Sequence, residues 1–294
     1  MKGHDRRALD ILGTGHFGML SGAERANTRQ AALPCTVVIM PGAMDVDQLI
    51  SSLDAQAARL NDARARIDRE IAWYPYNILG NLVHVDAMLT GENRDLGRLA
   101  QDLPVADIGA ADGDLAFVLE DIGGWEVDIV DTAATNMNGL QGARALRDHL
   151  GSRVQIYDVD LDRQFELPRD RYGLVFFLGI LYHLQNPFYA LRELASRSTH
   201  CLLSTKVARF AGPERTAIGD LPVAYLVAPR ETNNDPTNYW ILSPAGLERL
   251  VERAGWEILD QVNVGDTTDS DPSTPEHDER MFMLLRSAAP RGAA

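Results

Sequence analysis

Hydrophobic and polar positions divide the chain into a helical region followed by a region in which short apolar runs alternate with amphipathic ones. From Met44 onward, apolar residues recur every three or four positions, which predicts a helix: Ile50, Leu53, Ala57, Leu60 and Ile67. A second amphipathic stretch covers residues 76–89. Residues 1–43 show no such periodicity, so we expect them to be poorly ordered or an upstream extension, with Met44 as an alternative start.

After residue 98, the alternation of apolar runs and helical patterns is typical of a parallel sheet with helices on both faces. The expected strands are 105–108, 127–130, 154–157, 174–178, 201–205, 257–264 and 281–286. The expected helices are 114–121, 140–150, 187–196 and 243–254. We therefore predict an α/β fold with a mostly parallel, seven-stranded sheet that ends in a hairpin. A helical N-terminal cap over 44–98 precedes the main domain, 99–294, and residues 208–240 form an irregular insertion in it.

Composition narrows the function classes. The chain has 28 lysines and arginines against 42 acidic residues, and its net charge of −14 opposes non-specific attraction to nucleic-acid phosphates. No run approaches the ~18 apolar residues of a membrane span, and the first apolar run comes too late for a secretory signal. The two cysteines, Cys35 and Cys201, lack metal-ligand spacing and fit a reducing compartment. We expect a cytoplasmic protein with no metal site and no membrane contact.

The sharpest motif lies where the first expected strand enters a turn of small residues. Small side chains at such a turn let a ligand approach the backbone N–H groups at the start of the next helix. The motif has the order D-x-G-x-A-x-G, carried by Asp107, Gly109, Ala111 and Gly113. Because it departs from the G-x-G-x-x-G of dinucleotide sites, a nicotinamide oxidoreductase is the disfavoured alternative. The motif instead resembles the first motif of class I S-adenosylmethionine-dependent methyltransferases, with alanine at the usual middle glycine.

This resemblance implies a Rossmann-like class I methyltransferase fold with S-adenosyl-L-methionine as the cofactor. Asp131 follows the second strand, 22 residues after Gly109, where a carboxylate can accept both ribose hydroxyls. Asp158 follows the third strand and is favoured over Asp160 for the adenine amino group. The full set of expected cofactor contacts is Asp107, Gly109, Ala110, Ala111, Gly113, Asp131, Thr132, Asp158, Val159, Leu178, Gly179, Tyr74 and Tyr76.

A second motif follows the fourth expected strand, where residues 178–187 read L-G-x-L-Y-H-x-x-x-P. It is similar to the signature of the methyltransferase group that includes the tRNA wobble-uridine 5-oxyacetate synthase, a carboxymethyltransferase. The likeness covers about residues 67–286. In that group, lysine and arginine follow an I-D-x-E sequence, whereas residues 71–88 contain neither. A carboxylated cofactor and a tRNA backbone both favour nearby positive charge, so tRNA modification is the less favoured alternative.

Methyl transfer from a sulfonium depends mostly on positioning, but a hydroxyl or amine acceptor must also lose its proton. His183 is the candidate base, because its ordinary pKa suits neutral pH. The alternative is a packed, inert histidine. Tyr182 is a candidate substrate contact. Three aromatic residues, Trp73, Tyr74 and Tyr76, form either a lid over the cofactor or ordinary core.

Two loops have open interpretations. The amide- and aromatic-rich stretch 232–240 is either a pocket wall for a polar small molecule or a surface loop. The acidic segment 266–279 is expected to be a solvated loop. We predict methyl transfer to an O, N or C centre of a small molecule, in a biosynthetic or tailoring step. The alternatives are tRNA modification and a non-catalytic cofactor-binding protein, and the oligomeric state stays open.

Overall fold

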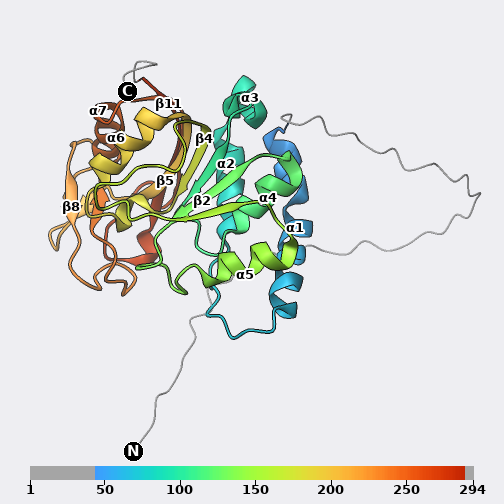
Figure 1. The fold of residues 1–294 in the computed structure, drawn as a ribbon. Helices are drawn as coiled ribbons and strands as arrows, with labels where there is room; N and C mark the ends of the chain where they lie inside the picture. Colours follow the sequence, from blue (N-terminus) through green and yellow to red (C-terminus); the bar gives the residue numbers. More distant parts are fainter. Residues whose placement is uncertain (1–43, 289–294) are drawn as a thin grey trace, which may run out of the picture. The chain divides into compact units, whose positions relative to one another are not determined.

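A path of seven strands forms the centre of the computed structural model, which describes residues 44–288 (Figure 1). In spatial order they are β10 (Trp256–Gly265), β11 (Glu279–Ser287), β5 (Ser198–Val207), β4 (Tyr172–Leu178), β1 (Val105–Ile108), β2 (Val127–Asp131) and β3 (Gln155–Asp158). Strands β1 to β5 pair in parallel, and β11 is antiparallel to both β5 and β10. The predicted α/β fold, mostly parallel sheet and final hairpin are confirmed. The third strand begins one residue later than expected.

Two further short strands extend this sheet. Strand β9 (Trp240–Leu242) joins β5 in parallel through Leu242 and Val207, and β8 (Ala224–Leu226) pairs antiparallel with β9. Strands β6 (Phe210–Ala211) and β7 (Thr216–Ala217) form a separate hairpin. The expectation that residues 208–240 are irregular is therefore wrong in part. Backbone pairing and a small apolar cluster that includes Ala208, Val227 and Ile241 order this segment.

Between residue 44 and β1 the structure has three α-helices. Helix α1 (Val46–Arg66) begins at a capping box, in which Asp45 and Gln48 each accept the other's backbone N–H. The second predicted helix begins late: a short 3₁₀ turn, η1 (Ile78–Gly80), leads into α2 (Asn81–Met88), because the Asn77 side chain accepts from Gly80 N and starts a turn there. Another 3₁₀ turn, η2 (Gly91–Arg94), leads into α3 (Leu96–Ala100), which the sequence pattern did not predict.

The later helices lie close to their expected positions. They are α4 (Asp114–Gly123), α5 (Gln141–Leu150), α6 (Pro187–Arg197) and α7 (Pro244–Arg253). Helices α6 and α7 both begin with proline, and the Ser243 side chain caps α7 as expected. Short 3₁₀ turns follow β4 as η3 (Leu181–His183) and precede β11 as η4 (Pro275–His277).

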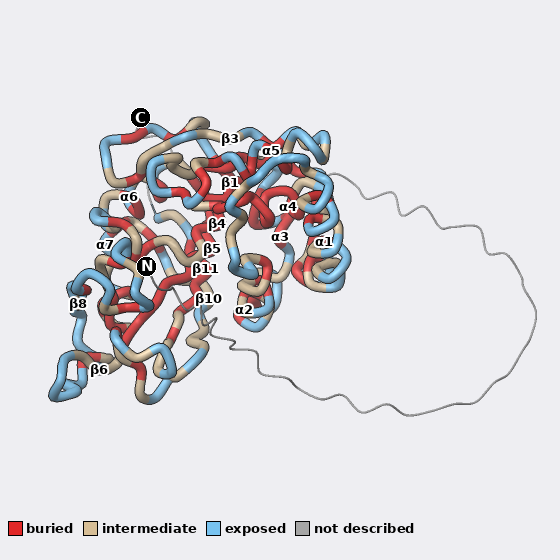
Figure 2. The backbone as a smooth tube through the Cα atoms, turned by 90° about the horizontal axis from the view of Figure 1, so that it is seen from below, coloured by how far each residue is buried: buried red, intermediate tan, exposed pale blue. Residues whose placement is uncertain are grey.

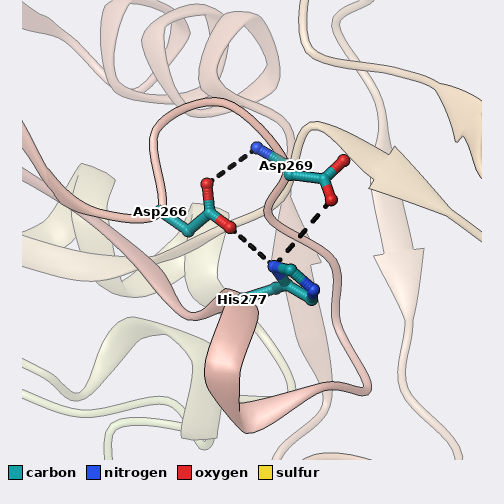
Figure 3. A group of neighbouring side chains, drawn as sticks. All are labelled: Asp266, Asp269 and His277. Atoms are coloured by element: carbon teal, nitrogen blue, oxygen red, sulfur yellow. Dashed lines mark hydrogen bonds and ion pairs between the residues drawn. The ribbon is translucent and has the colours of Figure 1, made fainter.

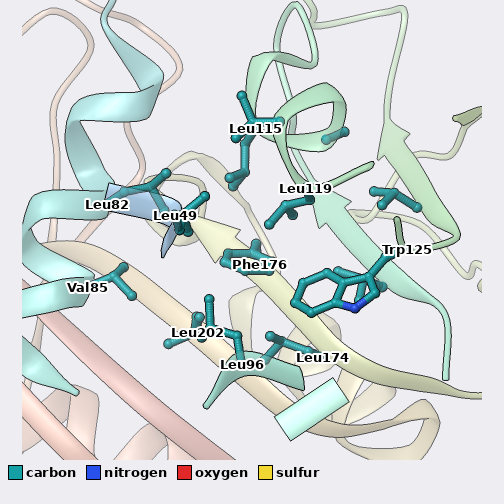
Figure 4. Packing of buried hydrophobic residues seen from close by; sticks show 14 of the residues in the cluster. Leu49, Leu82, Val85, Leu96, Leu115, Leu119, Trp125, Leu174, Phe176 and Leu202 are labelled. Atoms are coloured by element: carbon teal, nitrogen blue, oxygen red, sulfur yellow. The ribbon is translucent and has the colours of Figure 1, made fainter. Parts of the chain in front are cut away.

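The sheet separates two hydrophobic clusters, and alternate residues of each strand belong to different ones. In β4, Leu174 and Phe176 pack in the cluster that includes side chains from α1 to α5, whereas Val175 and Phe177 pack with α6 and α7. Figure 4 shows the first cluster, and Figure 2 shows buried strands flanked by helices with exposed outer faces. Helices therefore cover both faces of the sheet, as predicted.

None of the helices within residues 44–288 is long and apolar enough to cross a membrane. Cys201 is a free, buried thiol, and its burial raises its pKa. Cys35 and the expected disorder of residues 1–43 lie outside the described residues.

Candidate active site

The turn between β1 and α4 has the backbone conformation that its small residues suggest. Gly109, Ala111 and Gly113 all have positive φ, at 68°, 54° and 83°. A Cβ atom on Gly113 would lie 2.6 Å from the Ile129 side chain, and one on Gly109 would lie 2.4 Å from that of Ile180. Ala111 occupies a left-handed conformation that glycine adopts more readily, which explains why the usual motif has glycine there.

Asp131 joins this turn to the end of β2. One of its carboxylate oxygens accepts from Ala111 N at 3.1 Å and from Asn136 Nδ2 at 3.0 Å. The other accepts only from Thr132 N, at 2.7 Å. Burial raises the pKa of Asp131, and these hydrogen bonds oppose that rise. Since a carboxylate offers about four acceptor positions, at least one remains for a ligand hydroxyl.

Asp158, the last residue of β3, and Asp160, just after it, make different contacts. Asp158 accepts from Ala133 N at 2.9 Å, and Val159 N donates to the Asp131 carbonyl, so both lie beside the end of β2. Asp160 accepts from Asp162 N at 3.0 Å and pairs with Arg163, as expected of a turn-forming acid. The preference for Asp158 as the ligand-facing residue stays a prediction.

A buried carboxylate that sequence reasoning missed, Asp112, connects the turn to the segment before the domain. One of its oxygens accepts from Tyr74 N at 2.8 Å, and the other accepts from Asn138 Nδ2 at 2.7 Å. The Arg64 guanidinium of α1 lies 3.9 Å away and also binds Asp114. Two features of the sequence could have pointed to this contact. One is a polar residue inside the small-residue motif, and the other is the Asn-x-Asn sequence at residues 136–138.

The three aromatic residues proposed for a lid are not equivalent. The Tyr74 hydroxyl accepts from Met137 N at 2.8 Å, in the loop that follows Asp131. Burial, together with the nearby charges of Asp131 and Asp112, raises the pKa of Tyr74 to about 12, despite that hydrogen bond. Tyr76 is 72% exposed, and Trp73 packs against the core beneath the Arg64 guanidinium. Only Tyr74 is fixed against the loops of the candidate site.

Asp107 is buried beneath the turn rather than open to a cleft. It accepts a hydrogen bond from the backbone of Ala116, in the first turn of α4, while its Oδ2 atom has no partner. Burial and the neighbouring Asp131 raise the pKa of Asp107 to about 8. Because the N-cap residue Gly113 has no side chain, Asp107 takes over the capping of α4 from the strand below.

The end of β4 lies beside two cations that the sequence reading did not assign. Leu178 is half-buried at the strand end, and the Cβ position of Gly179 is 3.8 Å from a guanidinium nitrogen of Arg280. Arg280 is paired in register with Lys206 across β11 and β5, and both contact Asp278, at 3.5 Å and 2.5 Å respectively. Tyr182 is buried here, its hydroxyl hydrogen-bonded to Arg280.

His183 ends η3 and is half-buried. Its Nδ1 atom contacts Thr237, and its ring lies 4.2 Å from that of Tyr182. Burial lowers the pKa of His183 below its ordinary value, which favours the neutral imidazole. The small-residue turn follows β1, Asp131 ends β2, and Tyr182 and His183 follow β4. All of these residues therefore lie at the carboxyl ends of neighbouring strands. Ligands of open α/β sheets bind at this edge.

The acidic segment before β11 is a structured loop. Asp266, Asp269 and His277 gather there, as Figure 3 shows, and His277 Nδ1 lies 2.6 Å from Asp266 and 3.9 Å from Asp269. These contacts join the two ends of the loop. The expectation of a solvated segment is wrong at Glu279, which is buried in β11 and bound by Arg209, Ser270 and Asn263.

Comparison with known proteins assigns the family. The model of the methyltransferase domain family matches residues 87–261, more than half of the chain. This chain belongs to the methyltransferase domain family. The predictions of a methyltransferase and of a class I fold are thereby confirmed, and the expected cofactor, S-adenosyl-L-methionine, agrees with them.

Two similar solved structures are those of the N-terminal domain of EvdMO1, one with SAH bound and one in the presence of SAH and D-fucose. Both are 16% identical to this chain and cover 79% of it and 97% of their own length, with TM-scores of 0.51 and 0.52. At this identity the likeness concerns the fold. No curated protein is similar enough in sequence to count as a relative.

Proposed function

We propose that this chain transfers the methyl group of S-adenosyl-L-methionine to an O, N or C centre of a small molecule. The observation that carries the proposal is the position of Asp131. Its carboxylate is fixed by Ala111 N and Thr132 N between the small-residue turn and the end of β2, and it keeps a free acceptor position. A ribose diol is the group that a carboxylate in this place recognises.

The residues present fit an adenosyl sulfonium. Tyr74 and Asp158 lie beside the glycine turn through their bonds to the loops around Asp131. Three acids besides the protonated Asp107 lie in or beside this turn, Asp112, Asp114 and Asp131, and Arg64 is the cation paired with the first two. This excess of carboxylates suits a ligand with a positively charged sulfonium and ammonium group. When bound, the sulfonium supplies an activated methyl group, and the protein positions the acceptor.

Two observations favour a small-molecule acceptor over tRNA. The net charge is −14, and the two cations beside Gly179, Lys206 and Arg280, both contact Asp278. A phosphate backbone needs a row of available cations. Carboxymethyl transfer to a wobble uridine and non-catalytic binding remain the alternatives that the experiment distinguishes.

Calorimetry with S-adenosylhomocysteine tests the cofactor site. Asp131→Ala should weaken binding by about 10- to 100-fold, because hydrogen bonds to a charged group are lost. Asp160→Ala, which removes only the turn acid, is the matched control and should leave affinity unchanged. Equal affinities of the wild type and Asp131→Ala would contradict the site.

Transfer of label from methyl-labelled cofactor tests the acceptor class. Incubation with a small-molecule extract should yield labelled product, whereas uptake into a tRNA fraction would support the alternative. Binding without any transfer would indicate a non-catalytic protein. His183→Ala should slow turnover once an acceptor is found, and an unchanged rate would remove His183 from the reaction.

A further inference from the structure

His183 is fixed by a loop that lies more than fifty residues further along the chain. Its Nδ1 atom is 2.9 Å from Thr237 Oγ1 and 3.3 Å from the Thr237 carbonyl oxygen. Thr237 Oγ1 in turn lies 2.6 Å from Asp235 Oδ1, which also accepts from Thr237 N at 2.9 Å. These contacts form a chain from the imidazole through a hydroxyl to a carboxylate.

Further bonds hold the two segments together. Tyr239 N donates to the Tyr182 carbonyl at 2.9 Å, and Trp240 Nε1 donates to the Gln185 carbonyl at 3.3 Å. The Gln185 side chain also donates to the Tyr239 hydroxyl, at 3.2 Å. The segment 235–240 is therefore attached to residues on both sides of His183, and the imidazole meets Thr237 in a defined geometry.

The direction of these hydrogen bonds determines which ring nitrogen carries the proton. An ionised carboxylate only accepts, so the single hydroxyl proton of Thr237 points to Asp235. Thr237 Oγ1 then offers a lone pair to Nδ1, and the Thr237 carbonyl also only accepts. Both atoms that face Nδ1 therefore require Nδ1–H. In a neutral imidazole this leaves Nε2 unprotonated.

We infer that Thr237 and Asp235 are positioning residues that hold His183 as the Nδ1–H tautomer, so that Nε2 can take the proton of the methyl acceptor. This inference rests on the proposed function, in which His183 is the base. As the acceptor's heteroatom bonds to the methyl carbon, the carbon–sulfur bond breaks, its electron pair stays on sulfur, and the acceptor's proton passes to Nε2. Atoms and charge balance without another reactant.

The charged groups around His183 agree with a neutral ring. Asp235 approaches Nδ1 to 4.0 Å and raises the pKa, while burial lowers it and the charges of Lys206 and Arg280 lower it further. Tyr182 contacts the ring from the same turn. The Thr237 hydroxyl thus holds the proton on Nδ1, although no carboxylate is hydrogen-bonded directly to the ring.

Long-range ¹H–¹⁵N correlation spectra of the full chain with ¹⁵N-labelled histidine report the tautomer directly. The His183 signals are identified by their loss in His183→Gln. We expect the Nδ1–H form to be the majority in the wild type and in Thr237→Ser, which keeps the hydroxyl. It should fall below half in Asp235→Ala, where the Thr237 hydroxyl is free to donate to Nδ1, and it should also fall in Thr237→Val.

The wild-type spectrum by itself can overturn the inference, even if a variant does not fold. A majority of the Nε2–H form, or a tautomer ratio that Asp235→Ala and Thr237→Val leave unchanged, would overturn it. The test needs no cofactor or acceptor, so it is separate from the proposed function. If the Nδ1–H tautomer is found but His183→Ala retains full turnover, the role of His183 as base fails, and with it the catalytic part of the inference.

Discussion

The backbone N–H of Tyr74 lies 2.8 Å from the buried carboxylate of Asp112, joining the segment before the domain to the turn after β1. The same carboxylate binds Asn138 in the loop after β2. Three segments that are far apart in sequence therefore meet at one side chain. The geometry of the candidate cofactor site depends on this junction.

Replacing Asp112 with asparagine should destabilise the protein by about 2–4 kcal/mol, because a donor would then face the Tyr74 N–H or the Asn138 amide in a buried place. Urea unfolding measures the change. The control is Asp148→Asn, since the Asp148 side chain is 61% exposed and pairs with its neighbour Arg147. Equal unfolding midpoints for Asp112→Asn and the wild type would show that the junction contributes little.

Gly142→Ala should be destabilising although it lies in helix α5. Helix propensity alone would favour alanine by about 1 kcal/mol. A Cβ atom at Gly142, however, would lie 2.1 Å from Asp112 Oδ1, so the contact between Asp112 and Asn138 would be forced apart. We expect a net loss of about 1–3 kcal/mol by thermal or urea unfolding. Gly80→Ala, whose nearest neighbour is the Asn77 side chain at 3.3 Å, is the control and should change stability little.

Asp107 should make the stability of the protein depend on pH. Its pKa is raised to about 8, whereas the unfolded carboxyl has a pKa of ~3.9. Between these values the folded state holds a proton that the unfolded state has lost, so stability falls as pH rises from about 4 to 8. Asp107→Asn removes this proton exchange. As pH rises from 5 to 8, the Tm of the variant should therefore increase relative to the Tm of the wild type. Parallel curves of Tm against pH would contradict the effect of burial on Asp107.

The loop before β11 should also lose stability as pH rises, through a different pair of groups. The pKa of His277 is raised by its hydrogen bond with Asp266, and the pKa of Asp266 is lowered by the same bond. The ion pair therefore exists above the lowered carboxyl pKa and is lost as pH rises through the raised pKa of His277. Hydrogen exchange of residues 266–278, corrected for intrinsic rates, should be slower at pH 6 than at pH 9. His277→Gln should abolish this difference; if the variant keeps it, another group is responsible.

The parts of the fold that the sequence predicts are those set by local patterns. Apolar runs gave the seven strands, and the offset of Asp131 from Gly109 put that carboxylate beside the turn, where the structure has it bonded to Ala111 N. Helix α3 escaped prediction because it is only five residues long and its place is set by contacts such as that of its Leu99 carbonyl with His200. Short elements lack a period that can be recognised.

The missed residues of the site share one cause. Asp112, Arg280 and Thr237 act through partners in other loops, and the identity of those partners depends on how the loops pack. A single sequence records each residue type but not which distant loop it faces. The motif residues could be expected to lie close together, because strand order alone brings the ends of β1, β2 and β3 to one edge of the sheet.

Strand β11 has a consequence for synthesis on the ribosome. It lies between β5 and β10, although it follows both in the chain. The nascent polypeptide therefore cannot join β10 to the rest of the sheet until residues 279–287 have left the exit tunnel. Until then the backbone N–H and C=O groups along this edge of β5 are unpaired and open to pairing with other chains.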